Sequence, residues 1–128
     1  MTTSFTADCA FCLIVAGRAP AVVFREWSDA LAIRPRRGGV NDGHLLVLPR
    51  IHVENAGVSP VVAGRTMARA AELMAELPDA NIITSKGPAA TQTVYHLHIH
   101  VIPRRSGDGL ALPWHPGGES PAAKEAIQ

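Results

Sequence analysis

The chain has 128 residues, of which 47% are hydrophobic and 18% are charged, a balance typical of a folded domain and unlike that of a disordered segment. Its net charge of +1 predicts no long-range attraction to nucleic acid or to a membrane surface, and no apolar run reaches the roughly 20 residues of a membrane helix. No export signal is visible before the two cysteines, so we expect reduced thiols and a cytoplasmic protein.

The first predicted elements are a short helix and a β-hairpin. Residues 7–16 are expected to form the helix, with Asp8 as its N-cap and Gly17 at its end. Two short runs, residues 22–26 and 30–34, flank a three-residue turn and predict the hairpin.

The middle of the chain predicts a loop, a strand and a long helix. Residues 35–43 form a loop rich in arginine and glycine, and the apolar run 44–48 predicts a strand that Pro49 stops. Ser59 and Pro60 are typical of a helix start, with serine as cap and proline at the first helical position. Apolar residues then recur at spacings of four and three, which predicts a buried helical face made of Ala63, Met67, Ala70, Met74 and Leu77.

The C-terminal half adds a strand over residues 81–84, a loop over 85–92 and the clearest strand of the chain over 93–102. Strands and helices do not alternate regularly. This favours an α+β fold, a mainly antiparallel sheet with one long and one short helix packed on it. We expect a single domain over residues 1–115 and a flexible tail over 116–128.

Three histidines alternate with apolar residues in the run His96-Leu97-His98-Ile99-His100-Val101-Ile102. Side chains on a strand point to alternate faces, so the imidazoles share one face and the apolar residues point into the core. Such a face can bind a catalytic metal ion, or one histidine can attack phosphorus as a nucleophile. A solvated face with incidental histidines is a third interpretation. The preceding Gly-Pro loop offers groups that suit an anion, and Arg104 follows the strand.

This run resembles the signature of the histidine-triad (HIT) family. The stretch Gly43-His44-Leu45-Leu46-Val47-Leu48-Pro49-Arg50-Ile51-His52 is similar to the family's other characteristic strand. The segment around the triad looks like that of dinucleoside polyphosphate hydrolases, whereas Leu112-Pro113-Trp114 resembles the C-terminus of purine nucleoside phosphoramidases. The resemblance covers most of residues 9–115 and implies a HIT-like fold and a homodimer.

The resemblance also implies roles for individual residues. His98 matches the nucleophile, which would form a nucleotidyl-histidine intermediate that water hydrolyses. His100 matches a residue that holds phosphate and handles the leaving group, and His44 matches a supporting histidine. Contacts to the substrate are implied for Ser85, Gln92, Thr93 and Trp114, the last reaching the pocket of a partner subunit.

Several positions depart from the family pattern. Ser85 stands where an amide side chain commonly binds phosphate, and Thr91 replaces a usual glycine. Ala32 replaces an acidic residue that grips the ribose hydroxyls in one branch. The loop over residues 35–43 looks longer than usual and carries two adjacent arginines, Arg36 and Arg37. These changes bear on specificity for the nucleoside.

Cys9 and Cys12 form a Cys-x-x-Cys pair, which can be a redox pair, half of a zinc site or two buried thiols. The resemblance implies a structural zinc ion completed by His52 and His96. That division leaves His98 free to attack, and it leaves His115 as a surface residue or part of the pocket rim.

The predicted function is therefore hydrolysis at the α-phosphate of a nucleoside phosphate derivative, either a dinucleoside polyphosphate or a nucleoside phosphoramidate. One alternative is a nucleotidyl transferase or phosphorylase, in which an acceptor other than water takes the nucleotide. The other is a nucleotide-binding module that retains the triad without catalysis.

Overall fold

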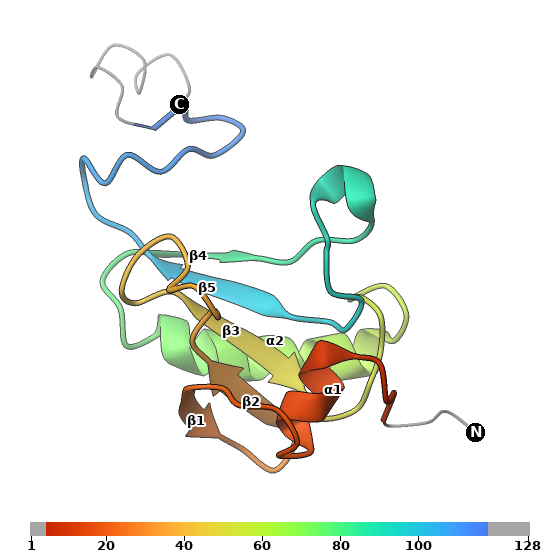
Figure 1. Cartoon of the computed structure of the whole chain (residues 1–128). Helices are drawn as coiled ribbons and strands as arrows, with labels where there is room; N and C mark the ends of the chain where they lie inside the picture. Colours follow the sequence, from red (N-terminus) through yellow and green to blue (C-terminus); the bar gives the residue numbers. More distant parts are fainter. Residues whose placement is uncertain (1–4, 118–128) are drawn as a thin grey trace.

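The computed structural model describes residues 5–117, in which five strands form one antiparallel sheet with the order β1-β2-β3-β5-β4 (Figure 1). The strands are β1 (Val23–Glu26), β2 (Ala30–Ile33), β3 (Leu45–Pro49), β4 (Ala80–Ile83) and β5 (Ile99–Pro103). The helices are α1 (Ala10–Val15) and α2 (Pro60–Met74), with a 3-10 turn η1 (Pro88–Ala90). The predicted α+β architecture, with one long and one short helix, is confirmed. The expected tail lies outside the described residues from 118 onward.

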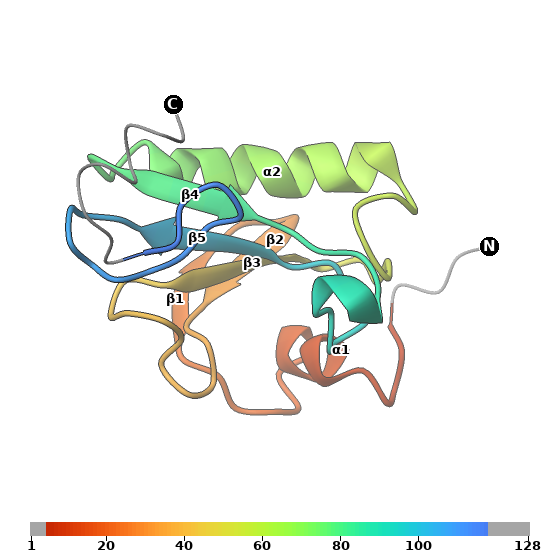
Figure 2. The same ribbon diagram turned by 90° about the horizontal axis from the view of Figure 1, so that it is seen from above.

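The two helices lie on opposite faces of the sheet, α2 on one and α1 on the other (Figure 2). Because side chains alternate along a strand, the central strands β2 and β3 are buried on both faces. The core under α2 contains Ala30, Ala32, Leu45, Val47, Ala70, Leu73, Leu97, Ile99 and Val101. The smaller core under α1 contains Cys9, Phe11, Cys12, Leu31, Ile33, Leu46 and Leu48.

Helix α1 begins later than predicted. Its N-cap is Cys9, whose Sγ accepts the backbone N–H of Cys12 at 3.3 Å, and Asp8 lies outside the helix and is exposed. A cap must have extended backbone and an acceptor that reaches the first turn, and the cysteine supplies both. The helix ends before Gly17, which has the positive φ of +74° common after helices.

Helix α2 has the predicted cap, with Ser59 Oγ accepting from Val62 N at 3.2 Å, but its buried face is rotated. Met67 is 42% exposed, and Thr66 faces the sheet instead. The Thr66 hydroxyl donates to the Val62 carbonyl at 2.8 Å, which satisfies the hydroxyl and allows its burial. None of the helices in residues 5–117 is long and apolar enough to cross a membrane.

The predicted strand over residues 93–102 is wrong at its beginning, since β5 starts at Ile99. The carbonyls ahead of it accept from side chains instead of from a neighbouring strand. Gln92 Nε2 donates to the Val94 carbonyl, and Thr84 Oγ1 donates to the His98 carbonyl. The chain bends at residues 94–96, and the alternation of faces continues from Leu97 into β5, because Leu97, Ile99 and Val101 are all buried in the core under α2.

Candidate functional site

The rings of His44, His98 and His100 lie together on the face of the sheet that carries α1. In the register of β3 with β5, His100 lies opposite Leu46, so His44, two residues before Leu46, projects from the same face. The ring centroids of His98 and His100 are 5.2 Å apart, and those of His44 and His100 are 5.1 Å apart. The structure therefore brings together the three histidines that the sequence predicted to act together.

The tautomer of His98 follows from its one backbone partner. Its Nδ1 lies 2.8 Å from the carbonyl oxygen of His96. Because a carbonyl can only accept, Nδ1 carries the ring proton and Nε2 keeps its lone pair. Burial lowers the pKa of His98, opposed by this hydrogen bond. The ring is thus neutral near pH 7, with Nε2 as a free base or nucleophile.

His44 and His100 form a directed chain of hydrogen bonds. The backbone N–H of Val40 donates to His44 Nδ1 at 3.1 Å, so the proton of a neutral His44 must be on Nε2. That nitrogen lies 2.9 Å from His100 Nδ1, which leaves the proton of His100 on its Nε2. Burial lowers the pKa of both rings, to about 4 for His100, where the neighbouring histidines add to the effect. His100 therefore presents an N–H donor beside the free base of His98.

Phe11 is a contributor to this site that the sequence did not reveal. Its ring meets His98 edge-on with centroids 5.1 Å apart, and meets His96 in the same way at 5.9 Å. This geometry is favourable between aromatic rings and holds α1 against the histidine face. The sequence offers only its place between the two cysteines as a signal, because the contact joins segments more than 80 residues apart.

Cys9, Cys12, His52 and His96 form a second cluster, with their ligand atoms all within 4.8 Å of one another. A tetrahedral zinc ion with ordinary bond lengths needs N···N and S···N separations of about 3.3 and 3.6 Å. The two histidine Nδ1 atoms are 3.2 Å apart, and three S···N distances are 3.3–3.5 Å. These residues fit a zinc ion.

The chemistry of the donors also suits a metal ion. His96 Nε2 lies 2.9 Å from the Pro49 carbonyl, so it carries the proton and leaves Nδ1 as the ligand atom. Burial lowers the pKa of His96 to about 4, which keeps the imidazole neutral, as metal binding requires. Burial also raises the pKa of the Cys12 thiol. A cation at this position would favour the thiolate.

The four residues predicted to contact substrate make no direct contact of their own with the histidine rings. Within residues 5–117, none of them has a hydrogen bond or ring contact to His44, His98 or His100. Ser85 is half-buried after β4, and Thr93 lines a pocket beside the metal cluster. Trp114 is 60% exposed in the C-terminal segment (residues 104–117), which extends beyond the end of β5 (Figure 1).

Gln92 is buried, and its amide is occupied within the chain. Its Oε1 accepts from Gly87 N at 2.9 Å, and its Nε2 donates to the Glu54 and Val94 carbonyls. The side chain therefore shapes the loop that contains η1.

The guanidinium group of Arg104 is also occupied within the chain. It donates to both carboxylate oxygens of Asp108 and to two other groups, which fixes the start of the C-terminal segment.

Comparison with known proteins agrees with this arrangement. The HIT domain family matches residues 16–107. An uncharacterized HIT-like protein of Mycobacterium tuberculosis is 40% identical over 111 residues, which cover 81% of this chain and 76% of the relative. An adenosine 5'-monophosphoramidase of Schizosaccharomyces pombe is 31% identical over 133 residues, covering 94% and 92%.

Among solved structures, a zinc-bound histidine triad family protein from Mycobacterium smegmatis superposes with a TM-score of 0.69 at 34% identity, covering 94% of this chain and 90% of its own. The triad face, the cysteine–histidine cluster and these similarities agree, and the chain belongs to the HIT family.

Proposed function

We propose that this protein is a hydrolase that cleaves a nucleoside phosphate derivative at its α-phosphate, with His98 as the nucleophile. The observation that carries the proposal is the hydrogen bond from His98 Nδ1 to the His96 carbonyl, because it leaves Nε2 as an unprotonated nucleophile. The name of the fission yeast relative, an adenosine 5'-monophosphoramidase, supports the same class of substrate.

In the first half-reaction His98 Nε2 attacks the α-phosphorus. An N–P bond forms, the bond from phosphorus to the leaving group breaks, and His100 Nε2–H donates a hydrogen bond to the leaving atom, which takes a proton from solvent. In the second half-reaction water attacks phosphorus and releases a proton to solvent, and the N–P bond breaks. The products are a nucleoside monophosphate and the protonated leaving group, and both histidines return to their starting state.

Cys9, Cys12, His52 and His96 hold a structural zinc ion in this proposal. When bound, the ion supplies no chemistry to the substrate and acts by joining three segments of the chain. It ties the start of α1 to the segment after β3 and to the extended segment before β5. Since the His96 carbonyl orients His98 and Phe11 packs on the same ring, the zinc site fixes the nucleophile indirectly.

The remaining substrate contacts come from this subunit and from its partner. In this subunit Ser85 and Thr93 provide hydroxyl groups, while Gln92 holds the shape of the η1 loop. Trp114, exposed in the described chain, contributes to the pocket of the second subunit of a homodimer. Light scattering at micromolar concentration tests the dimer, and a monomeric mass would contradict it.

Trapping the covalent intermediate tests the mechanism. The enzyme is mixed with a slowly cleaved adenosine 5'-phosphoramidate, quenched in acetone, digested and examined by mass spectrometry. An adenylyl group on His98, absent in His98→Asn, is the expected result. Full turnover by His98→Asn would overturn the proposal. A non-catalytic binding module gives neither adduct nor turnover, and a transferase gives the adduct but releases it faster with an acceptor than with water.

A further inference from the structure

We infer that Arg36 and Arg37 bind a second phosphate group of the nucleotide substrate, in addition to the phosphate that His98 attacks. The inference rests on the proposed function for the identity of the substrate. It concerns the β2–β3 loop (residues 34–44), which connects those strands and ends at His44.

The two arginines occupy the tip of a tight turn. The backbone N–H of Gly38 donates to the Pro35 carbonyl at 3.0 Å, which closes a four-residue β-turn with Arg36 and Arg37 at its two central positions. Both residues are exposed. Side chains at these positions project away from the body of the turn, so both guanidinium groups are available to a ligand.

This turn lies next to the histidine chain. Gly39 is so close to His44 that a methyl group there would be 2.7 Å from Cγ of the ring, and the next residue, Val40, donates its N–H to His44 Nδ1. An extended chain advances at most about 3.6 Å per residue. The backbone of Arg37 is therefore within about 7 Å of Gly39, a distance that an arginine side chain can span, so its guanidinium group can reach the surroundings of His44.

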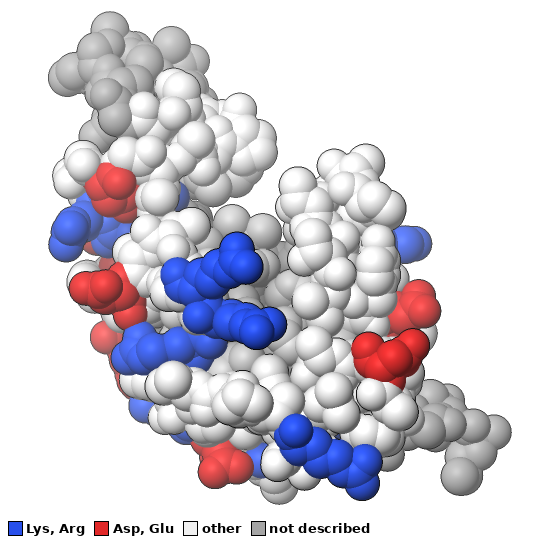
Figure 3. Space-filling model, viewed as in Figure 1, with Lys and Arg blue, Asp and Glu red and all other residues white. Residues whose placement is uncertain are grey.

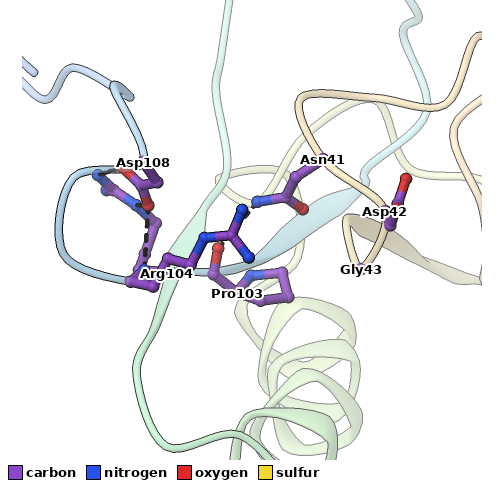
Figure 4. A pocket seen from close by; sticks show the side chains of 7 residues that line it. Asn41, Asp42, Gly43, Pro103, Arg104 and Asp108 are labelled. Carbon is purple, nitrogen blue, oxygen red and sulfur yellow. Dashed lines mark hydrogen bonds and ion pairs between the residues drawn. The ribbon is translucent and has the colours of Figure 1, made fainter. Parts of the chain in front are cut away.

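The loop is held on both flanks. Arg34 Nη1 donates to the Asp42 carbonyl at 2.6 Å and closes the base of the loop. Asn41 Nδ2 donates to the Pro103 carbonyl at 3.0 Å. A pocket of about 310 Å³ lies beside this clamp, between the loop and the C-terminal segment (Figure 4). Because the loop is anchored in this way, it loses little conformational entropy when its arginines bind a ligand.

No group in the described part of the chain neutralises the charges of the two arginines. Arg25, Arg50, Arg69 and Arg104 all make salt bridges, but Arg36 and Arg37 make no salt bridge or hydrogen bond within residues 5–117. The only acidic residue of the loop, Asp42, lines the pocket of Figure 4. Lys and Arg side chains gather over the β2–β3 loop at the edge of a hollow in the surface (Figure 3).

The geometry points to phosphate as the ligand. Guanidinium groups bind phosphate through paired N–H donors, and a substrate whose α-phosphate is at His98 can place a second phosphate near His44. That group is either in the leaving group, as in a dinucleoside polyphosphate, or on the ribose. Arg36 and Arg37 recognise the same chemistry in both cases, and substrates of each kind distinguish them.

The test compares wild type with Arg36→Gln/Arg37→Gln and with a matched control, Arg18→Gln/Arg65→Gln, which removes two exposed arginines elsewhere. The substrates are adenosine 5'-phosphoramidate, its 3'-phosphorylated form and diadenosine tetraphosphate. In Arg36→Gln/Arg37→Gln we expect kcat/KM for adenosine 5'-phosphoramidate to change less than twofold. For either the 3'-phosphorylated form or diadenosine tetraphosphate it should fall at least about tenfold. The substrate that shows this loss identifies the source of the second phosphate.

Equal losses on all three substrates, or no loss on any, would overturn the inference. If the wild type hydrolyses none of the three substrates, the proposed function fails. The inference about Arg36 and Arg37 can then still be tested by measuring nucleotide binding. Calorimetric titration with AMP, ADP and adenosine 3',5'-bisphosphate should show that ADP or adenosine 3',5'-bisphosphate binds more tightly than AMP, and the difference should vanish in Arg36→Gln/Arg37→Gln. Equal affinities for all three in the wild type would also contradict the inference.

Discussion

The direction of the hydrogen bonds around each ring decides the chemistry of the histidine face. A backbone carbonyl accepts from His98, and a backbone N–H donates to His44. These two main-chain groups have fixed roles, so they set opposite tautomers in the two rings. One ring then presents a lone pair, and His100 presents a proton. A pair of groups with these complementary roles is what a displacement at phosphorus needs.

Substitution of the histidines should separate these roles. His98→Ala removes the nucleophile, and turnover should fall to background while AMP binding changes little. His100→Ala removes only the hydrogen bond donated to the leaving atom and should slow turnover by about 10²–10³-fold. Single-turnover rates and equilibrium binding measure the two effects. Equal and small rate losses in both variants would mean that neither ring reacts with phosphorus.

Gly39 should be sensitive to the addition of a single methyl group. In Gly39→Ala the new Cβ would overlap Nδ1 and Cγ of His44, so the ring or the loop must move and the chain from Val40 to His100 is disturbed. We expect kcat to fall at least about tenfold, the equivalent of about 1.4 kcal/mol.

The matched control is Gly38→Ala. Gly38 has a φ of +82°, similar to the +65° of Gly39, but a Cβ there meets nothing within 4 Å. Both variants therefore carry the same backbone strain, of about 1 kcal/mol, and only one displaces His44. If the two variants lose activity to the same extent, the contact with His44 is not the cause.

At the scale of elements, α1 depends on tertiary contacts for its place. With six residues it is far shorter than the 12–15 or so that an isolated helix needs. Cys9 and Cys12 at its start join the metal cluster, and Phe11 packs on His96 and His98. The helix thus connects the metal cluster to His98, and its loss should disturb both.

Removal of one metal ligand should therefore release α1. In Cys12→Ser the zinc content should fall from one ion per chain to well below one, because structural zinc sites contribute about 10–16 kcal/mol of binding free energy in small peptides. Amides 9–17 should exchange their hydrogens much faster, while those of α2 change little. Elemental analysis and hydrogen exchange measure these effects.

Ala10→Ser is the control in the same helix, since Ala10 is exposed and its side chain belongs to neither cluster. It should retain zinc and slow exchange. A full zinc content in Cys12→Ser, with exchange like that of the wild type, would rule out the metal site.

At the scale of the whole molecule, the buried histidines should make stability depend on acidity. Burial lowers the pKa of His44, His98 and His100 in the folded protein relative to about 6.5 in an unfolded chain. Below pH 6.5 the unfolded chain binds more protons than the folded one, so unfolding becomes easier as the pH falls toward 4. Above pH 6.5 these groups contribute no pH dependence.

His100 alone, with its pKa lowered to about 4, should account for up to about 3 kcal/mol of this loss. Urea unfolding of wild type and His100→Gln at pH 7.5, 5.5 and 4.5 measures it, and loss of metal at low pH affects both proteins alike. The variant should lose less stability on acidification. Parallel curves for the two proteins would show that His100 is not buried in neutral form.

Much of the architecture and of the candidate site was predictable, because it depends on local patterns. Alternation of histidine with apolar residues predicted one histidine face even where no strand forms, since an extended backbone alternates its side chains with or without hydrogen-bonded partners. The serine-proline start of α2 was correct because capping involves only neighbouring residues. The predicted buried face of α2 was right at Ala63, Ala70 and Leu77 but wrong at Met67, because the sheet selects which residues are covered and Thr66 satisfies its own hydroxyl.

The sequence by itself determined the α+β class and the family, and it predicted the residues that we propose carry the chemistry. Only the tertiary structure decided which nitrogen of each histidine holds a proton, that Phe11 packs on His98, and that the loop carrying Arg36 and Arg37 reaches His44 through Gly39 and Val40. The physical reason is the same in each case. These features depend on contacts between segments distant in sequence, and on backbone groups whose positions appear only when the sheet, the helices and the β2–β3 loop are packed together.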